Sequence, residues 1–120
     1  MQEIGIESSL FQDILAGKKT VEIRLGKSKY IKMCVGDTLS IREDVWQGDR
    51  IVSSMPDQAR IIITQLLYFE YLEEALDSIG FQAAIPSATS KKEALARYRT
   101  FYTAKDEEEY GVIAITFSLV

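Results

Sequence analysis

Three ionisable residues that could act together on one ligand stand close to each other in the chain: Lys19, Glu22 and Arg24. Arginine can hold a phosphate or a carbonyl group through paired hydrogen bonds, and lysine can act as a point charge or, when desolvated, as a base. Glutamate can accept a hydrogen bond from the exocyclic amine of a base. A second interpretation is an exposed Glu–Arg ion pair, worth only ~0–1 kcal/mol. The spacing alone leaves both interpretations open.

A short helix should precede these residues. The segment Ser9–Ala16 is amphipathic, and Ser9 and Gln12 are spaced as a capping box at a helix start. Gly17 is a natural stop for that helix, because glycine readily adopts the left-handed conformation that ends many helices. The pattern therefore predicts a helix that ends just before the ionisable segment.

The ionisable residues themselves fall on a predicted strand. Apolar and polar residues alternate over residues 20–25 with the period of two that is typical of a β-strand. The apolar residues should face a core, which leaves Glu22 and Arg24 side by side on the opposite face. Lys18 and Lys19 stand at the entrance of the strand, where strict alternation would turn Lys19 toward the core. We expect Lys19 to lie just before the strand or to extend its ammonium group to the rim of the site.

These residues resemble the signature of the ASCH domain family, a branch of the PUA-like superfamily. The pattern G-x-K-x-x-E-x-R is filled by Gly17, Lys19, Glu22 and Arg24. Further stretches resemble family segments in the same order along the chain: Val35–Leu39, Tyr68–Leu76, Phe101–Thr103 and Glu107–Ile115. The resemblance covers nearly the whole chain and implies a single ASCH domain over residues 1–120.

The resemblance implies an α+β fold, a small mixed β-barrel of the PUA-like type with flanking helices around a cleft. The residues also predict an α+β order of elements. After the ionisable strand they predict a central strand, two helices and a last strand: Ala59–Phe69, Leu72–Ile79, a helix opened by Ser90, and Val112–Leu119. Between residues 43 and 58 the pattern is weaker, with a hairpin tip predicted at Gln47–Arg50 and a break at Met55–Asp57.

The resemblance further implies a cleft that binds RNA or a modified nucleoside. The residues expected to contact the ligand are Lys18, Lys19, Thr20, Glu22, Arg24, Tyr98 and Tyr102. The two tyrosines could close the pocket by stacking or donate to an oxyanion, although we favour core packing of their helix. Trp46 could stack on a base or close an edge of the core, and we favour the core edge. Glu107 and Glu108 are expected in a solvated turn.

A hydrolytic function is the alternative. Some small members of the family that this chain resembles are amidohydrolases that remove the acetyl group of N4-acetylcytidine, using a threonine nucleophile, an activating lysine and a supporting glutamate. Lys19 matches the lysine, but Glu22 occupies the position of the nucleophile. Glu22 would therefore have to activate water as a general base, with Lys19 stabilising the oxyanion. A third possibility is a structural or protein-interaction domain in which Glu22 and Arg24 form a buried pair.

Composition narrows the chemistry further. The chain has 120 residues, no histidine, one cysteine and a net charge of -4. We therefore expect one domain without a disulfide framework, a metal site, a cofactor or His-based catalysis. The N-terminal segment has no basic leader, and no long apolar segment is present, which favours a cytoplasmic protein without membrane contact. Positive charge gathers over residues 18–32, which suits a locally held anion unless residues 27–32 are only a solvated turn.

Overall fold

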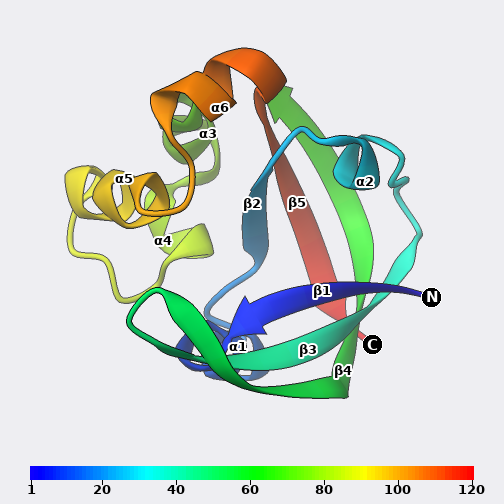
Figure 1. The fold of residues 1–120 in the computed structure, drawn as a ribbon. Coiled ribbons are helices and arrows are strands. Elements are labelled where there is room, and N and C mark those ends of the chain that lie inside the picture. The colour runs from blue at the N-terminus through cyan, green and yellow to red at the C-terminus, as the bar shows by residue number, and fades with distance from the viewer.

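The computed structural model describes residues 1–120, which fold into one sheet and a layer of helices (Figure 1). The strands are β1 (Gln2–Glu7), β2 (Val21–Leu25), β3 (Thr38–Gln47), β4 (Arg50–Phe69) and β5 (Val112–Leu119). The helices are α1 (Ser8–Leu15), α2 (Ser28–Ile31), α3 (Leu72–Ile79), α4 (Phe81–Ala84), α5 (Lys91–Arg99) and α6 (Ala104–Tyr110). The predicted α+β class is confirmed. None of the helices is long and apolar enough to cross a membrane.

The strands are arranged in the order β1-β3-β4-β5-β2. β1 and β3 are parallel, and all other neighbours are antiparallel. Strand β4, with 20 residues, connects the two halves of the sheet, because residues 50–62 pair with β3 and residues 61–69 pair with β5. Figure 1 shows β4 curving from one half to the other. β1 and β2 are left as the two edge strands.

The sheet is bent but open, so the predicted β-barrel is wrong in that it does not close. Closure would require a backbone ladder between β1 and β2, which stand at the two ends of the strand order. Side chains bridge this gap instead. Arg24 Nη2 donates to the carbonyl oxygen of Gly5 at 2.6 Å, and Lys29 Nζ donates to that of Glu3 at 2.7 Å. The carbonyl groups of Glu3 and Gly5 on edge strand β1 thereby have donors without a neighbouring strand.

Apolar side chains cover both faces of the bent sheet. A helix-side core of 13 buried residues lies among α3, α4, α5, β2 and β5. An inner core of 12 buried residues lies inside the bend, among β1, α1, β3, β4 and β5. Strand β5 serves both cores because its side chains alternate. Val112 and Ala114 face the helix-side core, whereas Ile113 and Ile115 face the inner core.

The segment with the weak sequence pattern is part of the sheet. The hairpin predicted at Gln47–Arg50 is confirmed, since β3 ends at Gln47 and β4 begins at Arg50. β4 runs through the break predicted at Met55–Asp57, so the strand does not end there, but its pairing with β3 is interrupted between Met55 and Ala59. A register shift against β3 and a φ of 54° at Asp57 accommodate the proline at position 56.

The helix caps are only partly as predicted. Helix α1 is capped by Glu7, whose carboxylate accepts the backbone N–H groups of Ser9 and Leu10, so the predicted capping box at Ser9 is wrong. The physical reason is that the end of β1 already places a carboxylate over the first turn. Ser90 caps α5 as predicted by accepting the N–H of Glu93 at 3.1 Å.

Glu107 is buried, so the solvated turn predicted for it is wrong. Its side chain turns inward from α6 and is only 4 % exposed. The carboxylate accepts the backbone N–H of Leu72 at the start of α3 and pairs with Arg99 of α5 at 2.7 Å. One carboxylate therefore connects three helices, whereas the neighbouring Glu108 is exposed.

Replacing Glu107 by alanine should lower the free energy of unfolding by about 1–3 kcal/mol, because the N–H of Leu72 would stay buried without an acceptor. Glu108→Ala is the matched control on the exposed side of the same helix, and it should change stability by no more than about 0.5 kcal/mol. Chemical denaturation of both variants measures the difference. Equal stabilities would show that the carboxylate of Glu107 does not hold the helices together.

Candidate functional site

A cleft of about 360 Å³ opens at the gap between the edge strands and faces helix α5. Its lining combines ionisable side chains of β2 and β3 with aromatic side chains of α2, β3 and the end of α5. The lining residues are Gly5, Glu7, Leu10, Glu22, Arg24, Lys29, Tyr30, Arg42, Asp44, Trp46, Ile51, Ile85, Arg97, Tyr98, Phe101 and Tyr102. The cleft thus lies where the strand order leaves both edges unpaired.

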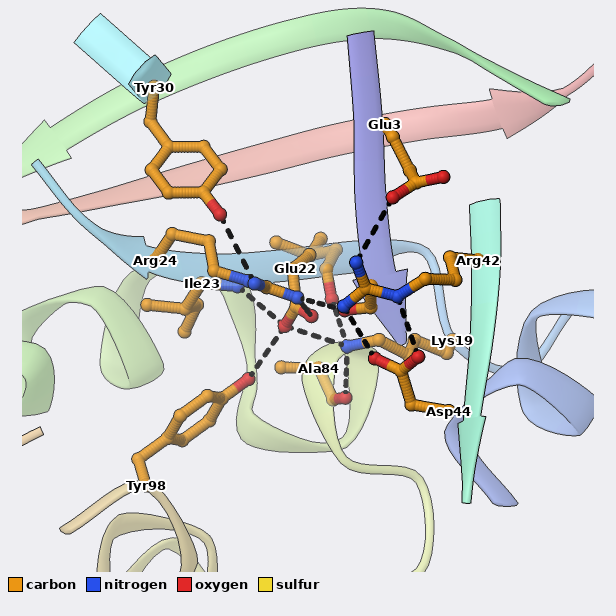
Figure 2. Close-up of polar contacts among 12 residues, drawn as sticks. Glu3, Lys19, Glu22, Ile23, Arg24, Tyr30, Arg42, Asp44, Ala84 and Tyr98 are labelled. Atoms are coloured by element: carbon orange, nitrogen blue, oxygen red, sulfur yellow. Dashed lines mark hydrogen bonds and ion pairs between the residues drawn. The ribbon is translucent and has the colours of Figure 1, made fainter. Parts of the chain in front are cut away.

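Glu22 is the centre of the polar network (Figure 2). Its side chain points to the inner face of the sheet and is only 7 % exposed, so the exposed ion pair considered from the sequence is wrong. Oε1 accepts the backbone N–H of Ile23 at 3.0 Å and the hydroxyl of Tyr98 at 3.5 Å, and it lies 3.4 Å from Lys19 Nζ. Oε2 accepts from Arg24 Nη2 at 2.9 Å.

Arg24 joins edge strand β2 to edge strand β1. Its Nη2 donates to Glu22 and to the carbonyl oxygen of Gly5, and its Nη1 donates to the hydroxyl of Tyr30 at 3.2 Å. These bonds leave the Nε–H and one Nη1–H without an acceptor in the protein. The side chain is 20 % exposed. Arg24 therefore has hydrogen-bond donors available for a ligand.

Lys19 lies beneath the network and does not line the cleft. As predicted, it stands just before β2, but its side chain is fully buried and does not reach the rim. Its Nζ donates to the carbonyl oxygens of Val21 at 2.7 Å and Ala84 at 2.6 Å, and it pairs with Glu22. These partners use the three N–H groups of the ammonium. Lys19 thus fastens α4 to the start of β2.

The charges in this network stabilise one another. Burial raises the pKa of a carboxyl group, but Lys19 and Arg24 lower the pKa of Glu22 to about 2. Burial likewise disfavours the charged guanidinium, but the carboxylate of Glu22 raises the pKa of Arg24 above its ordinary value. Complete burial lowers the pKa of Lys19, and Glu22 opposes that shift. Glu22 and Arg24 are therefore an ionised pair at neutral pH.

A second Arg–carboxylate pair, which the sequence patterns did not reveal, stands beside the first. Arg42 donates to both oxygens of Asp44, at 2.7 and 2.9 Å, and to Glu3 at 3.0 Å (Figure 2). Parallel pairing of β1 with β3 brings Arg42 level with Gly5. A Cβ at position 5 would lie 2.3 Å from Arg42 Nη2, so glycine makes room for the pair. The only sequence signal was the i, i+2 spacing of opposite charges, the same spacing as Glu22 and Arg24.

Aromatic side chains form the outer wall. Tyr98 and Tyr102 stack with ring centroids 5.9 Å apart. Tyr98 is part of the helix-side core, as the favoured interpretation predicted, and it also lines the cleft. Trp46 meets Phe101 edge to face at 5.5 Å and lines the mouth of the cleft. Trp46 packs against neither core, so the favoured interpretation as a core edge is wrong.

The structure brings only some of the predicted ligand-contact residues into the cleft. Those that line it are Glu22, Arg24, Tyr98 and Tyr102. Lys18 and Thr20 are exposed at the entrance of β2 and lie outside the lining. No group of three or more His, Cys, Asp or Glu side chains is placed to hold a metal ion.

The geometry does not favour the hydrolytic alternative. A carboxylate with a pKa of about 2 is a weak base at neutral pH. Lys19 has no N–H group left for an oxyanion in the cleft, because its donors are bound to Val21, Ala84 and Glu22. The arrangement suits the holding of a ligand better than the transfer of a proton.

The open sheet, the helical layer and the cleft between the sheet edges define an α+β domain of the PUA-like class. The ASCH domain model matches residues 4–120, and the chain belongs to the ASCH domain family. The family predicted from the pattern that begins at Gly17 is thereby confirmed. No curated protein sequence matches the chain.

Solved structures of similar chains have the same fold. The crystal structure of the hypothetical protein PH0355 is 25 % identical in sequence, with a TM-score of 0.84 over 99 % of this chain and 98 % of that chain. The solution NMR structure of protein PF0455 from Pyrococcus furiosus is 24 % identical, with a TM-score of 0.75 over 99 % and 96 % of the two chains. Protein EF3133 from Enterococcus faecalis V583 is 15 % identical, with a TM-score of 0.60 over 100 % and 76 %. The last two share the fold alone.

Replacing Glu22 by glutamine should lower the free energy of unfolding by about 3–5 kcal/mol, because the buried Lys19 and the partly buried Arg24 would lose the carboxylate that compensates their charges. Glu109→Gln, at an exposed carboxylate without an ion pair, is the matched control and should be nearly neutral. Urea denaturation measures both variants. If the two variants are equally stable, the three charges do not depend on one another as described.

The stabilising effect of Glu22 should disappear in acid. Its pKa is about 2 in the folded protein and about 4.5 when unfolded. Its contribution is therefore complete above about pH 4.5 and is lost as the pH falls toward about 2, a shift that corresponds to about 3 kcal/mol. The difference in unfolding free energy between wild type and Glu22→Gln should narrow over this range in a pH series of denaturation curves. If the difference in unfolding free energy stays constant down to about pH 2, the pKa of Glu22 is not lowered in the folded protein.

Proposed function

We propose that the cleft binds a nucleobase, presented by RNA or by a modified nucleoside. The observation that carries this proposal is the pairing of an ionised floor with an aromatic wall. The floor is formed by the ion pairs Glu22–Arg24 and Arg42–Asp44, and the wall by Tyr98 and its neighbours. Membership of the ASCH family, with its fold of the RNA-binding PUA-like type, supports the same function.

The dimensions of the cleft suit one base. A volume of about 360 Å³ falls within the range of about 300–1,000 Å³ that is usual for small-ligand sites. Planar side chains can stack on the face of a base, which typically contributes about 1–3 kcal/mol per base. A double helix could not enter a cleft of this size, so a single exposed base is the part of a nucleic acid that fits.

The polar floor offers a donor and an acceptor side by side. Arg24 retains unpaired N–H groups on Nε and Nη1, which can donate to a carbonyl oxygen or a ring nitrogen of a base. Oε2 of Glu22 has one partner and keeps a lone pair that can accept from an exocyclic amine. Because Gly5 and Tyr30 already hold the guanidinium in place, binding would not have to order it. Such a pair of groups matches the edge of a base.

Arg24→Lys should weaken binding of RNA by about 1–3 kcal/mol, because lysine keeps the charge but loses the planar arrangement of donors. Arg60→Lys, at an exposed arginine outside the cleft, is the matched control and should leave affinity unchanged. The measurement is a titration with a mixed-sequence single-stranded hexaribonucleotide, followed through the fluorescence of Trp46, the only tryptophan.

Circular dichroism and a melting curve confirm that the Arg24→Lys protein is folded before its affinity is compared. Titrations at two salt concentrations separate the phosphate contribution, which weakens with salt, from recognition of the base. If the wild-type protein does not bind the RNA even at low salt, the proposal fails. If the folded Arg24→Lys variant and the wild type have equal affinities, Arg24 does not contact the RNA.

A further inference from the structure

The mouth of the cleft carries exposed apolar surface that a single bound base would not need. Phe101, just beyond the end of α5, is 60 % exposed, although it is in edge contact with Trp46 of β3. Ile51, the partner of Trp46 across the β3–β4 hairpin, is 40 % exposed. All three residues line the cleft. Two segments far apart in the sequence thus meet to form one apolar platform at this end, the Trp46–Phe101 platform.

The other end of the cleft is basic. Lys27, Lys29 and Lys32 surround the short helix α2, and all three are exposed. Lys29 lines the cleft, where its ammonium donates to the carbonyl oxygen of Glu3 and lies 5.4 Å from the ring of Tyr30. In Figure 1, α2 and the tip of the β3–β4 hairpin lie on opposite sides of β2. Lys29 and the Trp46–Phe101 platform therefore both belong to the lining of the cleft.

We propose that the ligand of this cleft is a single RNA strand and not a free nucleoside, and that the Trp46–Phe101 platform stacks the nucleotide next to the one in the cleft. This inference rests on the proposed function. One base would occupy the cleft above Glu22 and Arg24, the lysines around α2 would contact phosphates, and the adjacent base would cover Phe101. A free nucleoside has neither the phosphates nor the second base.

The platform and the lysines would contribute to RNA binding in different ways. Base–aromatic stacking is tolerant of sequence because every base has a π-face, so the platform would add affinity without choosing the neighbouring base. Phe101 is already exposed, and a base can cover it without displacing another side chain. The lysines would add a salt-dependent contribution, which for single strands changes log K by about -0.7 per phosphate contact for each tenfold rise in salt.

The test compares two probes on the wild-type protein and on Phe101→Ala. One probe is a fluorescein-labelled mixed-sequence hexaribonucleotide, read by anisotropy, and the other is an equimolar mixture of the four ribonucleosides, read by Trp46 fluorescence. Phe101→Ala should weaken hexamer binding about 5- to 150-fold and should weaken nucleoside binding much less. Phe101→Tyr should retain hexamer affinity. Tyr71→Ala, at an exposed tyrosine outside the cleft, is the matched control and should bind both probes as wild type does.

A second variant tests the basic end without touching the platform. Lys29→Gln should reduce the salt dependence of hexamer binding by about 0.7 in slope, whereas nucleosides, which carry no phosphate, should show no such salt-dependent change between the variant and the wild type. If the hexamer binds wild type no more tightly than the nucleosides, or if Phe101→Ala weakens both probes equally, the inference is overturned while the proposed function stands. If neither probe binds wild type, the proposed function itself fails.

Discussion

The structure depends on one buried carboxylate placed between two cations, in the gap where the sheet does not close. Glu22 pairs with Lys19 and Arg24. Through these partners it is connected to the helical layer at Ala84 and to edge strand β1 at Gly5. Charges are costly to bury unless each is paired and hydrogen-bonded. No buried side-chain nitrogen or oxygen lacks a partner here, and that complete pairing offsets the cost.

The open sheet makes the cleft possible. In a closed barrel, β1 and β2 would pair through their backbones, and the ladder would occupy the space where the cleft now lies. Because the edges stay apart, side chains bridge them, and Arg24 remains partly exposed to solvent. The gap between β1 and β2 is therefore both the place where side chains hold the two edge strands together and the candidate binding site. Substitutions at Glu22 or Arg24 will affect stability and binding together.

The site has a fixed floor and an exposed mouth. Arg42 and Asp44 are held by several hydrogen bonds, and Asp44 is only 3 % exposed. Trp46 and Phe101, at the mouth, contact each other through ring edges and belong to neither core. A floor that is ordered before the ligand arrives reduces the entropy lost on binding. The exposed apolar mouth can accept any base as the neighbour of the bound base, because stacking does not distinguish between bases.

The sequence by itself determined the local elements, the family and the segment that carries the site. The period of two at residues 20–25 and the cap at Ser90 are short-range properties, which neighbouring residues set. The tertiary structure alone decided which residues meet. Alternation places Glu22 opposite the helix-side core, but only β1 and α5, which are distant in the sequence, enclose that second face and bury the carboxylate whose pKa Lys19 and Arg24 lower. Arg42 likewise reaches Gly5 only through the parallel pairing of β1 with β3, a long-range contact that no local pattern encodes.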